Sequence, residues 1–278
     1  MIRYALTPLK NIANEVARLS PTSLEPLPEH DLPVEILPLV KRLNYLFDQL
    51  DHAFDVQKRF VADAAHELRT PLTAIKLQLR TLERSFGEEE RIKAQDKLKL
   101  GVDRAARLVG QLLALARVEP EAPHFSISEV SINHLVTEII SEQSRIAAEK
   151  GISLIAKYAG PVKISGEPDA IRAMISNLVD NAIHYTLFGG MVEVALNQTE
   201  RTVIIEVADT GPGIPLEKRE LIFDRFNRGQ RTDATGCGLG LAIVKSAVTR
   251  HGGSITLGET VAGKGLKVTI ELPRNLMP

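Results

Sequence analysis

A histidine, a glutamate and a threonine stand within five residues of one another in the stretch DAAHELRTPLTA, residues 63–74. The apolar spacing around them predicts a helix in which His66, Glu67 and Thr70 share a face that points away from the apolar seam. A neutral imidazole there has a lone pair that can act as a nucleophile, and the adjacent carboxylate can hold the proton of the other ring nitrogen. Pro71 has no N–H and should bend or loosen the helix beside His66. A solvated helix face is the alternative interpretation, whereas a zinc protease is excluded because H-E-x-x-H needs a histidine at position 70.

A second group of polar residues occupies a helix that we predict at Glu167–Tyr185. Asn177, Asn181 and His184 follow one another at i, i+4 and i+7, so they share the side away from the apolar stripe. Asparagine side chains can donate to phosphate oxygens and can offer a carbonyl oxygen to Mg²⁺ without adding negative charge beside a triphosphate. A polar face without a ligand is the alternative. The apolar stripe consists of Ile171, Met174, Ile175, Leu178 and Ala182.

Asp209 stands at the end of a predicted strand, directly before the stretch TGPGIP. A carboxylate in that place can accept a hydrogen bond from an amino group such as that of adenine. Gly211 and Gly213 would let the backbone approach a base. These residues predict a nucleobase site at the strand end.

A second glycine cluster, TGCGLGLAIVKSAV, places Gly236, Gly238 and Gly240 directly before an apolar helix. Small residues at a helix start expose its amide hydrogens and the positive end of its dipole, which favours phosphate. The cluster therefore predicts a phosphate site.

The polar, cationic segment between the two glycine clusters, residues 216–235, has the length and composition of a lid. Phe223 and Phe226 would be its apolar anchors. Arg228 and Arg231 could reach phosphates from it.

Two other nucleotide-binding motifs are rejected. The stretch GETVAGKG, residues 258–265, resembles a P-loop, but Gly265 replaces the Ser or Thr that helps to bind Mg²⁺, and a strand is predicted to follow instead of a helix. Neither glycine cluster completes G-x-G-x-x-G after a strand, so a dinucleotide fold is not expected.

Apolar residues at alternating steps of three and four predict the helices that position the histidine. One seam covers residues 36–50 and another covers residues 61–86, and the stutter Leu46, Leu50, Phe54 joins them into one long helix. A further helix after the GEEE turn covers residues 98–116. Two such helices joined by a short turn form an antiparallel hairpin, whose apolar stripe is best buried by a second copy in a four-helix bundle. We infer a homodimer.

The remaining pattern predicts a second domain and an N-terminal extension. Residues 8–19 predict an amphipathic helix, and residues 20–33, with four prolines, an extended connector. After a linker, strands are predicted at 125–131 and 151–158 around a helix at 132–150. Two strand pairs are predicted at 191–197 with 202–209 and at 253–259 with 265–273. Helices segregated from a largely antiparallel sheet form an α+β sandwich.

Composition limits the function classes. The 278 residues suffice for about two domains. The formal net charge of −1 provides no field for a polyanion, so nucleic acid is not the favoured partner. The single cysteine, Cys237, excludes an internal disulfide framework and suits a reducing compartment. No run approaches the roughly 18–20 apolar residues of a membrane span, and no secretory signal pattern is present, so we expect a soluble chain.

Five segments in this order resemble the H, N, G1, F and G2 boxes of bacterial sensor histidine kinases: FVADAAHELRTPL, NLVDNAIHYT, DTGPGIP, FDRFNR and GCGLGLAIVK. The resemblance covers about residues 54–273, and residues 1–53 are similar to a HAMP signal-relay domain. It implies a dimerisation and phosphotransfer domain at 54–116, a linker at 117–121 and an ATP-binding domain of the Bergerat fold at 122–278.

The resemblance implies that ATP phosphorylates His66 and that the group passes to an aspartate of a cognate response regulator, with Mg²⁺ neutralising phosphate charge. Glu67 matches the family's general base, and Thr70 matches the position that orients water when the regulator is dephosphorylated. Asn181 matches a Mg²⁺ ligand. The nucleotide-binding residues that the resemblance implies are Asn177, Asn181, His184, Tyr185, Asp209, Gly211, Gly213, Arg228, Gly236, Gly238, Leu239 and Gly240.

The chain departs from the family pattern at two positions. His184 stands where the family often has a lysine facing the phosphates, and Cys237 stands where Thr or Ser is usual. Because the family usually has transmembrane helices ahead of HAMP, we expect this chain to be the cytoplasmic part of a membrane receptor. A pseudokinase scaffold and a Bergerat-fold ATPase are the alternative functions.

Overall fold

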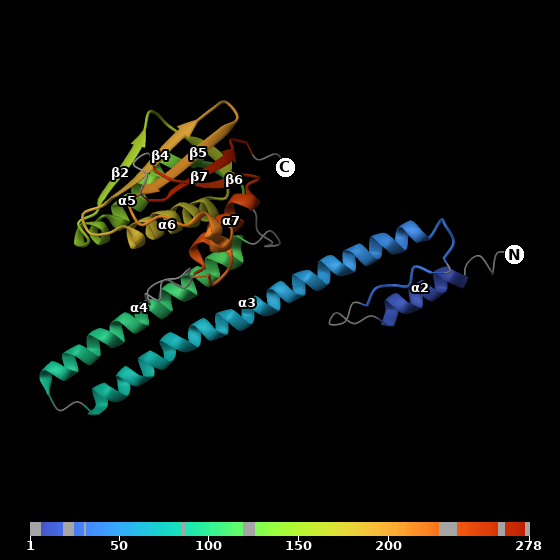
Figure 1. Cartoon of the computed structure of the whole chain (residues 1–278), viewed down its shortest axis with the longest axis horizontal. Coiled ribbons are helices and arrows are strands. Elements are labelled where there is room, and N and C mark those ends of the chain that lie inside the picture. Colours follow the sequence, from blue (N-terminus) through green and yellow to red (C-terminus); the bar gives the residue numbers. More distant parts are fainter. Residues whose placement is uncertain are drawn as a thin grey trace. The chain divides into compact units, whose positions relative to one another are not determined.

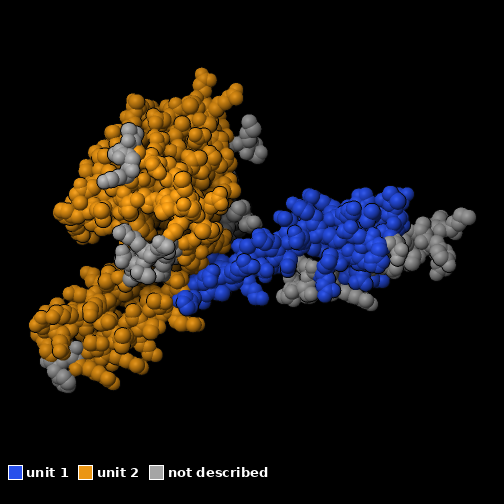
Figure 2. Space-filling view, in the orientation of Figure 1, with its two compact units in different colours: residues 1–66 blue, residues 67–278 orange. Residues whose placement is uncertain are grey.

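The computed structural model describes residues 7–18, 25–30, 32–84, 87–118, 126–227, 238–260 and 265–275. It divides into two compact units, residues 1–66 and residues 67–278 (Figure 2). The boundary between them falls inside the long helix α3, Leu37–Arg84.

The first unit contains helix α2, Thr7–Arg18, part of the extended connector, and the first part of α3. Ile12, Leu27 and Val40 form a small buried cluster, one residue from each of these three segments. The side-chain amide of Asn44 holds the connector, since its Oδ1 accepts from the backbone N–H of Leu27 at 2.7 Å and its Nδ2 donates to the carbonyl of Leu27 at 3.0 Å. The predicted N-terminal helix is confirmed.

Helices α3 and α4, Glu88–Val118, form the predicted helical hairpin (Figure 1). The prediction that two apolar seams belong to one long helix is confirmed, with Pro71 inside α3. Helix α4 begins earlier than its apolar spacing indicated, because Glu88, Glu89 and Glu90 form its first turn, where acidic side chains complement the positive helix end. Gly101 lets the two helices approach, since a Cβ there would lie 3.0 Å from Ile75 Cγ1.

A two-layer α+β sandwich follows the hairpin, as predicted (Figure 1). Its sheet has the order β2-β4-β5-β7-β6; β2 and β4 are parallel, and the other neighbours are antiparallel. Helices α5, α6 and α7 cover one face of this sheet. The strands are β2 Ser153–Tyr158, β4 Met191–Gln198, β5 Thr202–Asp209, β6 Ser254–Gly258 and β7 Lys267–Pro273; the helices are α5 Ile132–Glu149, α6 Pro168–Tyr185 and α7 Gly240–Arg250.

Strand β1, Ser128–Ser131, lies outside this sheet and pairs with β3, Lys163–Gly166. The sequence pattern predicted a strand at the position of β1 but none at the position of β3. Two short 3₁₀ turns, η1 Leu216–Lys218 and η2 Leu221–Phe223, follow β5. The core lies between sheet and helices, where alternate residues of β5 such as Val203 and Ile205 are fully buried. Within the described residues, no helix combines the length and apolarity that a membrane crossing requires.

Candidate functional site

Helix α6 presents the predicted asparagine face. Its apolar stripe from Ile171 to Ala182 is buried against the core. Asn177, Asn181 and His184 are partly exposed on the other side. The periodicity therefore placed these three side chains correctly.

The start of α7 lies directly against two of these side chains. A Cβ added at Gly240 would lie 3.0 Å from Asn177 Oδ1 and 3.2 Å from Asn181 Nδ2. The missing side chain of Gly240 thus leaves a small cradle between the asparagine amides of α6 and the first turn of α7. We call this space the Gly240 cradle.

The backbone amides at the start of α7 adjoin the Gly240 cradle. Leu239, the N-cap, makes no side-chain hydrogen bond to them, and the first turn contains no acidic residue. An uncapped helix start offers unsatisfied N–H groups and a partial positive charge, which bind anions such as phosphate. Together with the amide groups of two asparagines, the start of α7 offers polar groups of the kind that bind phosphate.

Asp209 ends β5 in a buried position, with 7% of its surface exposed. Its Oδ1 accepts from the backbone N–H of Gly211 at 2.7 Å and from that of Leu266 at 3.3 Å. Burial raises the pKa of the Asp209 carboxyl, and the two backbone hydrogen bonds oppose that rise. Both bonds from described residues end on one oxygen, so the other can receive a further donor.

Three glycines permit the backbone to close around Asp209. A Cβ at Gly211 would lie 2.8 Å from both Asp209 Oδ1 and the carbonyl oxygen of Tyr185, the last residue of α6. Gly213 has a φ of 70°, and a Cβ there would lie 3.0 Å from the carbonyl oxygen of Gly265. Gly265 itself, with a φ of 104°, approaches the Asp209 carbonyl so closely that a Cβ would lie 1.8 Å from its oxygen.

Gly265 and Leu266 are residues that sequence reasoning missed at this site. The segment 258–265 is not a P-loop, because strand β7 follows it instead of a helix. The sequence does contain a signal for Gly265. A glycine directly before a predicted strand can indicate a backbone position of positive φ, whether or not it belongs to a motif.

Gly238, in the G2 box, packs against the backbone of Phe226, in the F box. Its φ is 73°, and a Cβ would lie 2.6 Å from the carbonyl carbon of Phe226. The N–H of Phe226 donates to the carbonyl of Gly238 at 2.9 Å. Phe226 adopts a φ of 62°, a conformation that is unfavourable for an aromatic residue, so this contact holds a strained turn.

The C-terminal end of α6 is anchored by α5. Lys150 Nζ, just beyond α5, donates to the carbonyls of Ile183 at 3.0 Å and of His184 at 3.3 Å, two of the carbonyls that a helix end leaves unsatisfied. The His184 ring packs edge-on against Tyr185, with ring centroids 4.9 Å apart.

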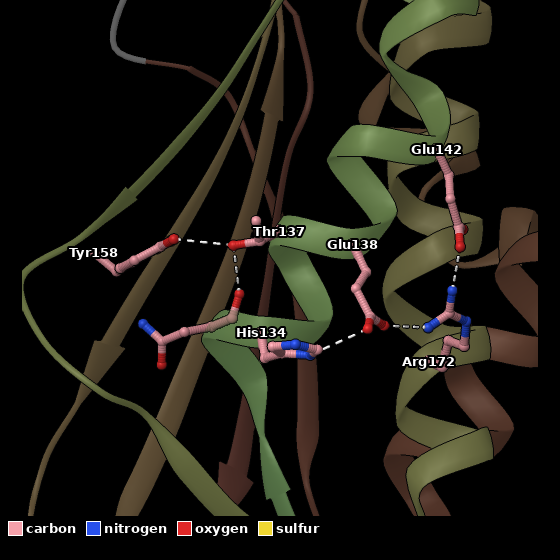
Figure 3. A network of polar contacts seen from close by, with 7 residues as sticks. His134, Thr137, Glu138, Glu142, Tyr158 and Arg172 are labelled. Carbon is pink, nitrogen blue, oxygen red and sulfur yellow. Dashed lines mark hydrogen bonds and ion pairs between the residues drawn. The ribbon is translucent and has the colours of Figure 1, made fainter.

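A polar network braces the outer faces of α5 and α6 (Figure 3). Arg172 of α6 contacts Glu138 at 2.8 Å and Glu142 at 2.5 Å, and Glu138 also contacts His134 at 3.2 Å. A surface hollow of about 460 Å³ lies among these residues. Because its charged groups already pair with one another, we interpret the network as a brace.

Helix α4 also touches the asparagine face. Gln111 Nε2 donates to Asn177 Oδ1 at 3.5 Å, a long hydrogen bond. Leu108 and Leu115 of α4 are buried.

His66, Glu67 and Thr70 lie in the middle of α3, as predicted. His66 and Thr70 are exposed and Glu67 is partly exposed.

Several predicted site residues lie outside the described residues. These are Arg228, Gly236 and Cys237, together with Arg231 and most of the second half of the expected lid. Asn177, Asn181, Gly240 and Leu239 are brought together, and Asp209, Gly211, Gly213 and the end of α6 at Tyr185 form the neighbouring group.

The residues present fit a magnesium ion bound chiefly through phosphates. Among the described parts of the chain, no three His, Cys, Asp or Glu residues are grouped to hold a metal. Mg²⁺ often takes one or two protein oxygens plus phosphate oxygens and water. The amide oxygens beside the Gly240 cradle can supply that small number.

Comparison with known proteins gives three matching family models. Residues 6–52 match the PhoQ-like sensor protein HAMP domain, and residues 56–121 match the His Kinase A phospho-acceptor domain. Residues 166–276 match the histidine kinase-, DNA gyrase B- and HSP90-like ATPases. The last region contains the Gly240 cradle and Asp209.

The chain is similar to the sensor protein kinase PmrB of Pseudomonas aeruginosa, with 36% identity over 274 residues that cover 98% of this chain and 57% of PmrB. It therefore spans little more than half of that relative. Full-length ShkA, solved with AMPPNP, has 30% identity and a TM-score of 0.58, covering 77% of this chain and 45% of ShkA. ThkA, solved with the response regulator protein TrrA, shares the fold with a TM-score of 0.64 at 20% identity, covering 80% of this chain and 63% of that one.

Proposed function

Since the chain belongs to the sensor histidine kinases of two-component systems, we propose that it transfers the γ-phosphoryl group of ATP to His66 and then to an aspartate of a response regulator. The observation that carries this proposal is the Gly240 cradle, where two asparagine amides meet the start of α7, at which the N-cap Leu239 supplies no side-chain hydrogen bond. Such a site suits the phosphates of a nucleotide.

Asp209 is the proposed adenine-binding residue. Its Oδ1 is held by two backbone N–H groups, so the carboxyl has a fixed orientation from which the other oxygen can accept from the amino group of adenine. Gly211, Gly213 and Gly265 keep side chains out of the space around it. Tyr185, at the end of α6, completes the proposed base site.

Asn177 and Asn181 are the proposed phosphate and Mg²⁺ residues, with Asn181 as a metal ligand. Bound Mg²⁺ would neutralise charge on the phosphates, which is a large part of phosphoryl-transfer catalysis. The asparagines would orient the triphosphate, and Gly238, Leu239 and Gly240 would present backbone to it. Gly236 and Arg228 remain proposed contacts on the family pattern, and His184 replaces the lysine that is common there.

His66 is the proposed nucleophile. Its exposure on α3 permits an approach by ATP and by a regulator, and Glu67 beside it can hold the proton of the ring nitrogen that does not attack. Thr70, one turn later on the same face, is proposed to orient water when the regulator is dephosphorylated.

We further propose a homodimer built on the α3–α4 hairpin. Exposed apolar residues along α3, including Leu46, Val61 and Leu72, need a cover that a second copy would provide. A response regulator is the proposed protein partner, as TrrA is for ThkA.

We also propose that this region belongs to a longer membrane receptor, because sensor histidine kinases usually have transmembrane helices ahead of the HAMP domain.

Incubation of the full chain with γ-labelled ATP tests the reaction. We expect an acid-labile label on the wild type and none on His66→Gln, while His134→Gln, which alters an exposed histidine elsewhere, keeps the label. Equal labelling of His66→Gln would contradict the proposal. An unlabelled wild type would favour the alternative of a pseudokinase scaffold, and steady phosphate release without label would favour an ATPase.

Asp209→Asn tests the adenine site separately. The amide can still accept the two backbone hydrogen bonds through its oxygen but presents –NH₂ to the base, so we expect at least about tenfold weaker ATP binding, about 1.4 kcal/mol. Unchanged affinity in calorimetry would show that the adenine assignment is wrong.

A further inference from the structure

The end of α7 carries a buried imidazole that the proposed reaction does not use. His251, directly after the helix, is 1% exposed. Its Nε2 accepts from the backbone N–H of Glu167 at 3.1 Å, and its Nδ1 lies 2.7 Å from the carbonyl oxygen of Ala247. Because Nε2 accepts, the ring hydrogen must be on Nδ1 and be donated to Ala247. The ring is therefore a neutral, defined tautomer.

The N–H that His251 accepts belongs to the N-cap of α6. In a capping box, a Glu or Gln at the third helical position accepts this N–H, but α6 has Ala170 there. Glu167 makes no side-chain cap hydrogen bond of its own. His251, 84 residues away, thus supplies from α7 the acceptor that α6 lacks.

Two more contacts lie where the end of α7 meets the start of α6. Gly166 makes room for the ring, since a Cβ there would lie 2.9 Å from His251 Nε2. Arg250 Nε lies 3.1 Å from Glu167 Oε2, and the side chains are 5% and 14% exposed. Arg250 and His251, at the end of α7, therefore both contact Glu167 at the start of α6.

The opposite ends of this helix pair form the Gly240 cradle. The end of α7 meets the start of α6 at His251, and the start of α7 meets Asn177 and Asn181 farther along α6. The two helices are therefore antiparallel, and a slip of one against the other by a single residue would amount to about 1.5 Å. That is half of the 3.0 Å that separates the Gly240 Cβ position from Asn177 Oδ1.

We infer that His251 is a positioning residue, which through its hydrogen bond to Glu167 fixes the register of α7 against α6 and thereby the width of the Gly240 cradle. The inference rests on the proposed function, because it assigns to the cradle the phosphates of the nucleotide. His251 contacts no substrate; it acts through the two helices.

Two isosteric substitutions separate the two hydrogen bonds of the ring. His251→Gln places an amide oxygen near the position of Nε2 and retains the acceptor for Glu167, whereas His251→Asn places an amide nitrogen near Nδ1 and retains only the donor to Ala247. We expect His251→Gln to bind MgADP within about twofold of the wild type, and His251→Asn and His251→Ala to bind about tenfold more weakly, a difference of about 1.4 kcal/mol.

Calorimetric titration of the full chain with MgADP measures these affinities, with His134→Asn as the control for an exposed histidine. Wild-type affinity in His251→Asn and His251→Ala would overturn the inference, as would equal weakening in His251→Gln, since a role in filling space does not distinguish the amide positions. A wild type that does not bind MgADP would overturn the proposed nucleotide site itself.

A pH profile decides the matter if His251→Asn and His251→Ala do not fold. Protonation of the ring removes its acceptor, so the MgADP affinity of the wild type should fall more steeply than that of His251→Gln as the pH is lowered below 6.5 through the titration of the ring. The charged groups that act on this ring are Glu167 of the α6 start and Arg250 of α7. Identical profiles of the two proteins would overturn the inference.

Discussion

Helices α6 and α3 carry apolar residues at the same spacing of three and four, yet their apolar sides differ in burial. Met174 and Leu178 of α6 are 0% and 2% exposed, whereas Leu46, Val61 and Leu72 of α3 are 48%, 60% and 56% exposed. The apolar stripe of α6 is therefore buried by other residues of the ATP-binding region, whereas the apolar seam of α3 stays exposed within this chain. Periodicity predicts that an apolar stripe will be buried. It does not predict whether the covering surface belongs to the same chain or to a second copy.

This difference predicts two kinds of stability. The ATP-binding region should unfold with a free energy that is independent of protein concentration. The hairpin should gain stability with concentration, because a cover provided by a second copy acts by mass action.

The largest expected effect contrasts two leucines. Leu178→Ala should destabilise the ATP-binding region by about 2–5 kcal/mol at every protein concentration, since it leaves a cavity in a closed core. Leu72→Ala should lower hairpin stability and dimer affinity in a concentration-dependent way. Chemical unfolding at two concentrations, with sedimentation to measure the dimer, checks both. Concentration-independent loss in Leu72→Ala would remove the contrast.

A second contrast uses glycines inside helices. Gly240→Ala should weaken MgADP binding about tenfold, about 1.4 kcal/mol, because the new Cβ occupies the Gly240 cradle. Gly110→Ala in α4 has no atom within 4 Å of its Cβ and should stabilise the hairpin by up to about 1 kcal/mol. Calorimetric titration and thermal melts measure the two effects. Normal nucleotide affinity of Gly240→Ala would argue against the cradle as the phosphate site.

A third contrast uses pH on the buried groups of the ATP-binding region. Burial lowers the pKa of His251 below 6.5, so the unfolded chain binds more protons than the folded chain just below that pH, and stability should fall as pH drops through this range. Burial raises the pKa of Asp209 above 3.8, so its contribution is present at low pH and is lost as pH rises through the raised value. Urea unfolding of the wild type and of His251→Gln measures the first effect. An equal pH slope near 6 in both proteins would contradict it.

The smallest expected effect concerns the brace between α5 and α6. Arg172→Met breaks two ion pairs whose side chains are 37–58% exposed, so the loss should stay below about 1 kcal/mol. Salt titration of the melting temperature checks the charge contribution. A larger loss would mean that charges, rather than the apolar stripe, hold α6 in place.

Local spacing was sufficient to predict much of the fold and part of the site. The long helix, the hairpin, the buried stripe of α6 and the hairpin of β4 and β5 all depend on residues close in sequence. Asn177, Asn181 and His184 share a face because helical geometry requires it. The roles proposed for them still rest on the predicted chemistry.

The missed features depend on contacts between distant residues. His251 pairs with Glu167 across 84 positions, and Leu266 pairs with Asp209 across 57. Strand β3 is only four residues long and exists as the partner of β1. No periodicity in a single segment encodes such pairings, because the partner residues carry no pattern of their own.

Gly265 offers a way to read natural variation in proteins related to this one. With a φ of 104° and 1.8 Å between its Cβ position and the Asp209 carbonyl oxygen, the position excludes every side chain while the backbone keeps this path. A relative that carries another residue there must have a different backbone path beside the aspartate that corresponds to Asp209. We therefore expect position 265 to distinguish relatives that retain nucleotide binding from those that have lost it, even where Asp209 and both asparagines are intact.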